Sequence, residues 1–252
     1  MDDACRKSHH EYYNLNFDDS SIIPLPMIIN KKPLSDNYEK NKIVSVGRIT
    51  AFKPYPFGVV KAIKKLNDTT GLKLTYHIIG EGHEYDKLKK LVANLKMQKN
   101  VIFYGTIPYS EINNIIKDAY CFIGMGTTVG EAAGIGLPSL VAIIDEENDS
   151  YDLLGRLPNN ILGEPGEDLR TIPYEESLYN LCNLTPEAYQ RERELSLKKA
   201  AYYAVENVAE LFIKAFKKGA DDTLKFSTLD LLLFEATRIQ LKFFLKKGYR
   251  HK

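Results

Sequence analysis

Between residues 41 and 142, short β-branched runs alternate with longer amphipathic runs. Apolar residues recur every three or four positions in the amphipathic runs, which is the period of a helix that buries one face. The β-branched runs are nearly continuous, as in strands that are buried on both faces. The pattern predicts strands over residues 42–46, 72–79, 101–104, 119–123 and 139–143. It predicts helices over 58–67 and 84–95, a helix that starts at Pro108, and a short helix over 128–135.

Strands that alternate with helices form βαβ units, which build a parallel sheet covered by helices on both faces. Several predicted strands end directly at a glycine, as at Gly47, Gly80 and Gly105. The predicted fold class is therefore α/β, with a Rossmann-like parallel sheet followed by C-terminal helices. Ligands of such sheets bind outside the carboxyl ends of the strands. We therefore expect the chemistry of this chain in the segments that follow its strands.

The alternation predicts three parts along the chain. Residues 1–40 lack it, and residues 41–218 form the predicted Rossmann-like domain, which is mostly helical beyond Pro173 and includes a charged amphipathic stretch over 187–218. Residues 219–252 form a predicted basic, amphipathic helical tail. Such a helix either lies on an anionic membrane surface, where lipid-linked acceptors reside, or packs on the domain or on an absent half. Packing is the favoured interpretation.

The composition is that of a globular enzyme or binding domain without strong charge. Hydrophobic residues make up 44% of the chain, and 34 Lys and Arg stand against 33 Asp and Glu. This balance argues against a dedicated nucleic-acid binder. The N-terminus shows no signal-peptide pattern, and no apolar run is long enough to span a membrane. The cysteines Cys5, Cys121 and Cys182 lack metal-ligand spacing and indicate a reducing, cytoplasmic compartment.

Two cations follow the first predicted strand. Arg48 comes directly after Gly47, and Lys53 stands five residues further on. A guanidinium group forms paired hydrogen bonds to phosphate oxygens and an ammonium group supplies a point charge, so together they suit a diphosphate. For an arginine and a lysine at this spacing without other evidence, a solvated surface pair is the more common explanation.

A glycine-rich segment over residues 124–138 follows the fourth predicted strand. Glycines let a ligand approach the backbone closely, and the free amides at a helix N-terminus attract phosphate. Glu131 is expected in the first turn of the helix that begins here. Its carboxylate either compensates the helix dipole or accepts hydrogen bonds from the two hydroxyls of a ribose.

Four blocks stand in a defined order along the chain: Val46–Arg48 with Lys53, Ile78–Gly82, Asn100–Gly105, and Glu131 and Ala132 with Gly136 and Pro138. They resemble the C-terminal, nucleotide-sugar-binding domain of the retaining GT-B glycosyltransferases related to capsule and lipopolysaccharide enzymes, sucrose synthase and glycogen synthase. The resemblance covers about residues 20–217. Each block alone is a weak signal, and the ordered combination is more specific.

The resemblance implies a role for each matching residue. Arg48 and Lys53 would hold the donor diphosphate, and Glu131 would grip the ribose. These three are the predicted catalytic residues. The other predicted donor-binding residues are Gly47; Gly105, Thr106 and Ile107, which would face the nucleobase; and Gly126, Thr127 and Thr128, which would face the phosphates.

The resemblance also implies catalysis without a metal or another cofactor, with a nucleoside-diphosphate sugar as the substrate. The cations and the helix dipole would stabilise the departing nucleoside diphosphate. The donor's own phosphate would assist a front-side attack, so no protein nucleophile is expected. The acidic run over residues 145–149 implies no ligand geometry and is interpreted as a solvated loop rather than a metal site.

The chain departs from the family pattern in two ways. The pattern places a glutamate eight positions before Glu131, and Ile123 stands there, so that the carboxylate near the donor sugar is missing. The hydroxyl of Thr127 or Thr128 is a candidate replacement. The resemblance implies that residues 1–40 are only a remnant of the N-terminal acceptor-binding domain followed by the interdomain linker. In this remnant a last helix is expected over 8–13, and the run over 22–26 leads into the linker. Because catalysis needs both substrates positioned together, we expect donor binding with little or no sugar transfer by this chain alone.

Two hypotheses follow for the function. The first is a donor-binding domain of a glycosyltransferase that serves a saccharide or lipid-linked acceptor in capsule or lipopolysaccharide synthesis, in the cytoplasm or at the inner face of the membrane. The second is a non-catalytic nucleotide-sugar-binding or regulatory module that pairs with a separately encoded acceptor domain. A dinucleotide-dependent Rossmann enzyme is disfavoured, because Gly47–Thr50 does not follow the G-x-G-x-x-G pattern.

Overall fold

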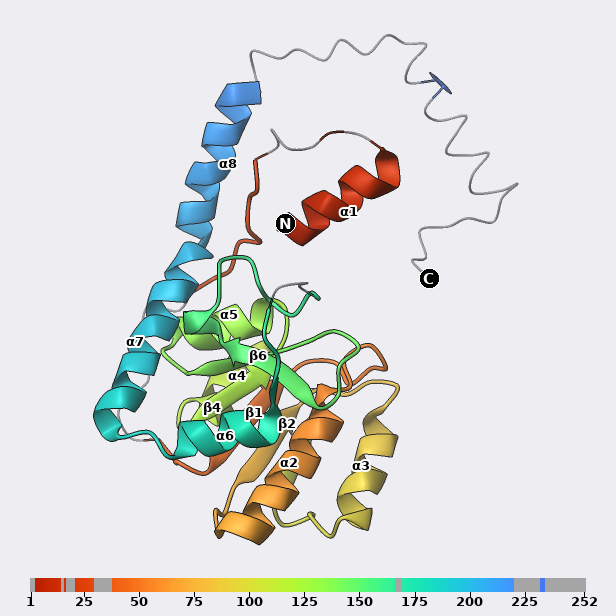
Figure 1. Cartoon of the computed structure of the whole chain (residues 1–252), viewed down its shortest axis with the longest axis vertical. Helices are drawn as coiled ribbons and strands as arrows, with labels where there is room; N and C mark the ends of the chain where they lie inside the picture. The colour runs from red at the N-terminus through yellow and green to blue at the C-terminus, as the bar shows by residue number, and fades with distance from the viewer. Residues whose placement is uncertain are drawn as a thin grey trace. The chain divides into compact units, whose positions relative to one another are not determined.

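The computed structural model describes residues 3–14, 16, 21–29, 38–165, 169–219 and 232–233. The chain divides into two compact units, residues 1–211 and 212–252. The first unit contains the sheet and the helices that cover it (Figure 1). Most of the predicted tail over 219–252 lies outside the described residues, so the basic helix expected there stays a prediction.

A seven-stranded sheet forms the centre of the first unit, with strand order β3-β2-β1-β4-β5-β6-β7. The five predicted strands are present and pair in parallel, which confirms the predicted fold class. Two further strands, β6 and β7, extend the sheet in the antiparallel sense and were not predicted. The strands are β1 (Lys42–Val46), β2 (Thr75–Ile79), β3 (Val101–Gly105), β4 (Cys121–Gly124), β5 (Ser139–Ala142), β6 (Asp149–Leu153) and β7 (Ile172–Pro173).

Helices cover both faces of the sheet, as the βαβ pattern predicts (Figure 1). Pro108 stands just before its helix instead of opening it, since its ψ of 140° is extended. The helices are α1 (Asp3–Tyr13), α2 (Tyr55–Thr70), α3 (Tyr85–Asn94), α4 (Tyr109–Ile116), α5 (Thr127–Gly134), the 3₁₀ turn η1 (Leu154–Arg156), α6 (Tyr174–Cys182), α7 (Pro186–Tyr202) and α8 (Val205–Gly219).

Neighbouring residues of the central strands point into two separate apolar cores. In β1, Ile43 belongs to the core that includes the apolar side of α2, and Val44 belongs to the core that includes α5. Both side chains are fully buried. Successive side chains of a strand point to opposite faces of the sheet, so a strand covered on both faces needs a continuous apolar run. This requirement explains why β1 lacks the polar alternation of a half-exposed strand.

The amphipathic stretch over 187–218 forms two helices with a break at Tyr203 and Ala204. At this break the amide of Met27 donates a hydrogen bond to the Tyr203 carbonyl (2.8 Å), and the amide of Val205 donates one to the Met27 carbonyl (3.0 Å). Met27 is 2% exposed, and a Cβ on Gly130 of α5 would lie 2.2 Å from its sulfur. The segment that precedes the sheet is therefore anchored between α5 and the start of α8.

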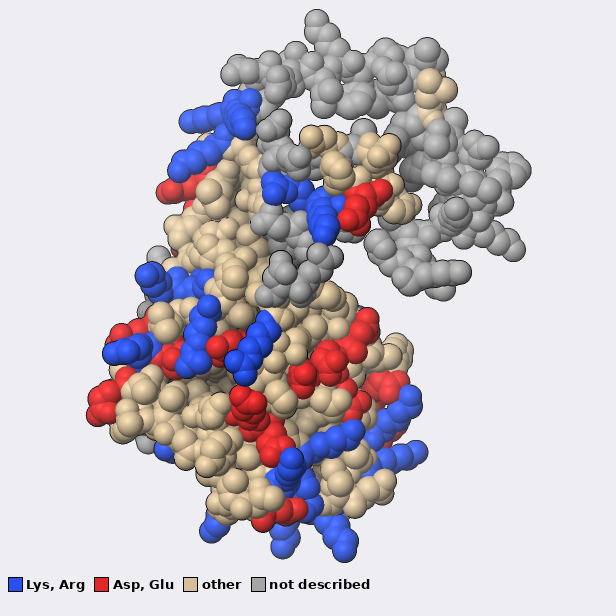
Figure 2. All heavy atoms as spheres, in the orientation of Figure 1, with Lys and Arg blue, Asp and Glu red and all other residues tan. Residues whose placement is uncertain are grey.

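Charged side chains of both signs are spread over the face of the first unit seen in Figure 2. This distribution agrees with the near-neutral balance of the sequence. The helices in the described part of the chain are all too short or too polar to cross a membrane. Cys121 and Cys182 are buried thiols, and burial is the main cause that raises the pKa of each.

Candidate functional site

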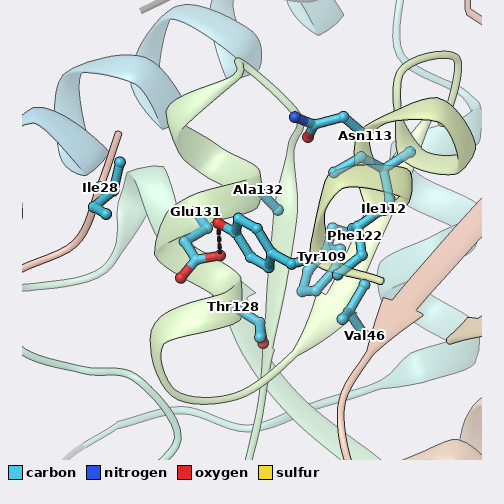
Figure 3. A pocket seen from close by; sticks show the side chains of 10 residues that line it. Ile28, Val46, Tyr109, Ile112, Asn113, Phe122, Thr128, Glu131 and Ala132 are labelled. Atoms are coloured by element: carbon cyan, nitrogen blue, oxygen red, sulfur yellow. Dashed lines mark hydrogen bonds between the residues drawn. The ribbon is translucent and has the colours of Figure 1, made fainter. Parts of the chain in front are cut away.

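The chain order of the strands reverses between β1 and β4, because β2 and β3 lie on one side of this pair and β5 lies on the other. Open α/β sheets bind ligands at such a reversal. A pocket of about 180 Å³ lies here, between α4 and α5 (Figure 3). Its lining residues are Val46 of β1, Phe122 of β4, Tyr109, Ile112, Asn113 and Ile116 of α4, Thr128, Glu131 and Ala132 of α5, and Ile28.

Glu131 brings a half-buried carboxylate into this pocket. The hydroxyl of Tyr109 donates a hydrogen bond to its Oε2 atom, over 3.1 Å. The prediction that Glu131 lies in the first turn of its helix is wrong, because α5 begins at Thr127 and its first turn contains no acidic residue. The helix dipole acts mainly within the first turn, so dipole compensation is a poor explanation for this carboxylate. The role of this carboxylate as a hydrogen-bond acceptor for a ribose stays a prediction.

Arg48 and Lys53 lie near each other in the segment between β1 and α2. Arg48 is exposed and Lys53 is half-buried. Burial lowers the pKa of Lys53, and the positive charge of Arg48 lowers it further. Among the ion pairs of the described residues, none includes either side chain. Two like charges held together in this way suit an anion with several charged oxygens, such as a diphosphate.

Two glycines hold the Arg48 segment against the loop that follows β2. A Cβ at Gly80 would lie 2.1 Å from the carbonyl oxygen of Gly47, and a Cβ at Gly82 would lie 2.1 Å from that of Ile49. Backbone hydrogen bonds join the same two segments. Glycine is needed at both places because any side chain would collide with the backbone. The Gly80–Gly82 block therefore positions the residues on either side of Arg48, a role that the sequence alone did not reveal.

The start of α5 presents backbone amides without a side-chain cap. Only Met125 and Gly126 connect β4 with this helix, and Gly126 has a φ of 73°, in the left-handed region. The Thr128 hydroxyl donates to the Met125 carbonyl (3.3 Å), and no side chain caps the helix. Uncapped amides at a helix start are a suitable site for phosphate. This geometry is compatible with the predicted role of Gly126, Thr127 and Thr128.

Gly105, Thr106 and Ile107 do not line the pocket. Gly105 ends β3 with a φ of 65°, and the Thr106 hydroxyl donates a hydrogen bond to Glu81 (3.2 Å). The chain then enters α4, whose first residue, Tyr109, does line the pocket. The binding of a nucleobase by this segment stays a prediction.

The position of the missing glutamate lies inside the core. Ile123 belongs to β4 and is 0% exposed, and its carbonyl accepts a hydrogen bond from the Ser45 hydroxyl over 2.6 Å. A carboxylate at this position would point into packed apolar side chains instead of the pocket. The position that carries a glutamate in the family pattern is therefore a buried core position in this chain. Replacement by a hydroxyl of Thr127 or Thr128 stays a prediction.

The acidic run over 145–149 covers most of the connection between β5 and β6 and ends on the first residue of β6, so the prediction of a loop fails at Asp149. Glu146 Oε1 accepts hydrogen bonds from the amides of Asn148 (2.7 Å) and Asp149 (3.3 Å), and Glu147 forms an ion pair with Lys61 of α2. These contacts use the carboxylates to fasten the loop to itself and to α2. Nowhere in the described ranges do three or more His, Cys, Asp or Glu side chains gather in a way that could hold a metal ion.

Residues 28–144 match the family described as "Glycosyl transferases group 1". The matched segment contains β1 to β5, α2 to α5 and all residues that line the pocket. It is shorter than the range of about 20–217 over which the sequence resembles the GT-B enzymes. No curated protein sequence matches the chain.

Solved structures extend this finding to the fold. A mutant of TarM from S. aureus, in complex with fondaparinux, alpha-GlcNAc-glycerol and UDP, is 18% identical with a TM-score of 0.61, and the match covers 86% of this chain and 43% of that chain. A GtfA/B complex is 17% identical with a TM-score of 0.64, over 88% and 45% of the two chains. Alr3699/HepE from Anabaena, in complex with UDP, is 14% identical with a TM-score of 0.59, over 84% and 61%.

The fold is that of a GT-B glycosyltransferase domain. The pocket at the strand reversal is therefore part of a domain with the GT-B fold, and its lining residues lie within the segment that matches the group 1 family. The chain spans less than half the length of the TarM and GtfA/B structures. The sequence analysis did not single out Tyr109, which only the tertiary structure brings to Glu131. It also missed other residues that line the pocket, which are Ile28, Ile112, Asn113, Ile116 and Phe122.

Proposed function

We propose that this GT-B domain binds the nucleoside-diphosphate part of a sugar donor, for transfer of the sugar to a saccharide or lipid-linked acceptor in surface-polysaccharide synthesis. One observation carries the proposal: the carboxylate of Glu131 and the uncapped start of α5 meet at the reversal between β1 and β4, where Arg48 follows β1. The presence of UDP in the TarM and HepE structures supports a nucleotide ligand.

Different residues bind different parts of the donor. Arg48 and Lys53 bind the diphosphate with a planar guanidinium and a point charge, together with the first amides of α5. Glu131 accepts hydrogen bonds from the ribose hydroxyls. As the bond between sugar and phosphate breaks, negative charge grows on the diphosphate, and these fixed positive groups stabilise it. The reaction proposed needs no metal and no protein nucleophile, and it proceeds with retention through assistance by the donor's own phosphate.

A second candidate function is a non-catalytic nucleotide-sugar-binding or regulatory module that pairs with a separate acceptor domain. The observation that favours it is the burial of Ile123 in β4, because the pattern carboxylate that would face the donor sugar has no counterpart at this position. The first candidate requires both affinity for the donor and transfer in the presence of an acceptor domain. The second requires only affinity.

Arg48→Ala is expected to weaken the binding of a nucleoside diphosphate by roughly tenfold to a hundredfold, because a hydrogen-bonded charge on phosphate contributes about 1.5–3 kcal/mol. Glu131→Ala is expected to weaken it by about tenfold. Isothermal titration calorimetry with UDP, GDP and ADP measures both effects and identifies the base that is preferred. The loss in Arg48→Ala should shrink at high salt, where phosphate contacts are screened.

Arg191→Ala is the matched control, because Arg191 is an exposed arginine on α7 that does not line the pocket. Its affinity should equal that of the wild-type chain. The proposal is wrong if none of the three nucleotides binds to the wild-type chain at millimolar concentration, or if Arg48→Ala and Arg191→Ala bind equally well.

The chain by itself is expected to bind the donor but to transfer sugar slowly or not at all, since transfer needs the acceptor held against the donor. The measurement is release of nucleoside diphosphate from a sugar nucleotide with a saccharide acceptor, compared with hydrolysis in its absence. Rapid, acceptor-dependent turnover by the purified chain would contradict this expectation and would also exclude the non-catalytic alternative.

A further inference from the structure

Tyr109 connects the two helices that border the pocket. It is the first residue of α4, directly after Pro108, and its hydroxyl reaches Glu131 Oε2 on α5 over 3.1 Å (Figure 3). Its side chain is 69% exposed, so the apolar core contributes little to holding it in place. The hydrogen bond to Glu131 is therefore the main described contact that gives this side chain a defined position.

The direction of the hydrogen bond follows from the protonation of the two groups. Partial burial is the largest cause that raises the pKa of Tyr109, and the charge of Glu131 and the hydrogen bond to it raise the pKa further. The phenol therefore keeps its proton at neutral pH, and its hydroxyl donates a hydrogen bond to the carboxylate. A donor on one oxygen restricts the rotation of the glutamate side chain, which would otherwise lose that freedom only when a ligand binds.

Within the described part of the chain, the Tyr109 hydroxyl is the one side-chain group that forms a hydrogen bond with this carboxylate. An ionised carboxylate has two oxygens with about four acceptor positions, and the Tyr109 hydroxyl occupies one of them on Oε2. The Oε1 atom and a second position on Oε2 remain. Two neighbouring hydroxyls of a ribose need two such acceptor positions. The hydrogen bond from Tyr109 therefore fixes the orientation of the Glu131 carboxylate and leaves two or more acceptor positions for the ribose.

We propose that Tyr109 is a positioning residue that holds Glu131 ready for the two hydroxyls of a ribose, and that it thereby sets a preference for ribonucleotides over deoxyribonucleotides. The inference rests on the proposed function, because it assigns a ligand to Glu131. It extends that function to a residue outside the four blocks of the family pattern. Removal of the Tyr109 hydroxyl should weaken only those ligands that use Glu131.

The test compares Tyr109→Phe with the wild-type chain by calorimetry. The ligands are UDP, ADP and GDP, each beside its 2′,3′-dideoxy form. We expect Tyr109→Phe to lower the affinity for the ribonucleotide that binds best by about threefold to tenfold, as for the loss of one hydrogen bond. The affinity for the dideoxy form should change by less than about twofold, because that ligand makes no contact that depends on Glu131.

Tyr104→Phe is the matched control. It removes the same atom from a tyrosine of β3 whose hydroxyl bonds with His77 Nδ1 (2.9 Å) and does not line the pocket. It should leave both affinities unchanged. If Tyr109→Phe lost the same affinity for both forms of the nucleotide, Tyr109 would act through packing. If Tyr109→Phe bound the ribonucleotide as tightly as the wild type or more tightly, Tyr109 would not position Glu131. Either result overturns the inference and leaves the proposed function intact, whereas a wild-type chain that binds no nucleotide overturns both.

Discussion

An Ile123→Glu variant is expected to lose its folded structure at neutral pH. Ile123 is 0% exposed in β4 and belongs to the apolar core that also contains α2. An unpaired carboxylate in such a place costs several kcal/mol, in addition to the apolar contacts that are lost. The expected loss of at least about 5 kcal/mol equals the whole stability of a marginal domain. Circular dichroism should show no cooperative thermal transition, and the soluble yield should fall.

Two controls separate the charge from the change of shape. Ile123→Val keeps the position apolar and should cost only about 1 kcal/mol. Ile123→Gln has the size of the glutamate without its charge and should fall between the two. A folded Ile123→Glu chain that binds a sugar nucleotide more tightly than the wild type would show that this position faces the donor. That result would overturn the conclusion that the glutamate of the family pattern has no counterpart here.

A Gly80→Ala variant is expected to lose about 3–5 kcal/mol of stability and to bind nucleotides more weakly. Gly80 has a φ of 124°, which side chains rarely adopt, and a Cβ there would lie 2.1 Å from the carbonyl oxygen of Gly47. Backbone strain and the forced separation of two backbone segments each cost about 1–3 kcal/mol. Because Gly47 precedes Arg48, the displacement also moves the guanidinium group. Urea denaturation measures the first effect and calorimetry the second.

Gly71→Ala separates strain from collision. Gly71 has a φ of 73° at the end of α2, and a Cβ there would meet no atom within 4 Å. Only the cost of the left-handed conformation applies, about 1–2 kcal/mol, and nucleotide binding should be unchanged. If Gly80→Ala and Gly71→Ala were equally stable and bound equally well, the close approach of the two loops would not matter for the site.

The periodicity of the chain was sufficient to predict the parallel sheet. Buried strands need continuous apolar runs and covering helices need one apolar side, and both patterns are local. The same reasoning predicted where the site lies, because parallel strands end at the same edge of a sheet. The positive charge of Arg48 contributes to the lowered pKa of Lys53, as expected for two cations in one segment, and their convergence on a shared anion stays a prediction. The binding roles of these residues and of Glu131 stay predictions.

The antiparallel strands show where this reasoning ends. β6 (Asp149–Leu153) begins with an acidic residue, which belongs to the run over 145–149 that the sequence predicts to be a solvated loop. It is a strand because β5 offers it an edge to pair with, and β7, a strand of only 2 residues, pairs in turn with β6. A strand of this kind has no clear period of its own, since its partner supplies the hydrogen bonds that define it.

The sequence by itself determined the fold class, the five parallel strands with the helices between them, and the edge of the sheet where the candidate pocket lies. Only the tertiary structure decided that Tyr109 bonds to Glu131, that Ile123 faces the core, and that Met27 enters between α7 and α8. The physical reason is that a local pattern reports which side of an element is apolar. Contacts between residues that are distant in the sequence form only when the whole chain folds. They depend on how the helices and strands pack together, and the pattern within one segment carries no information about this packing.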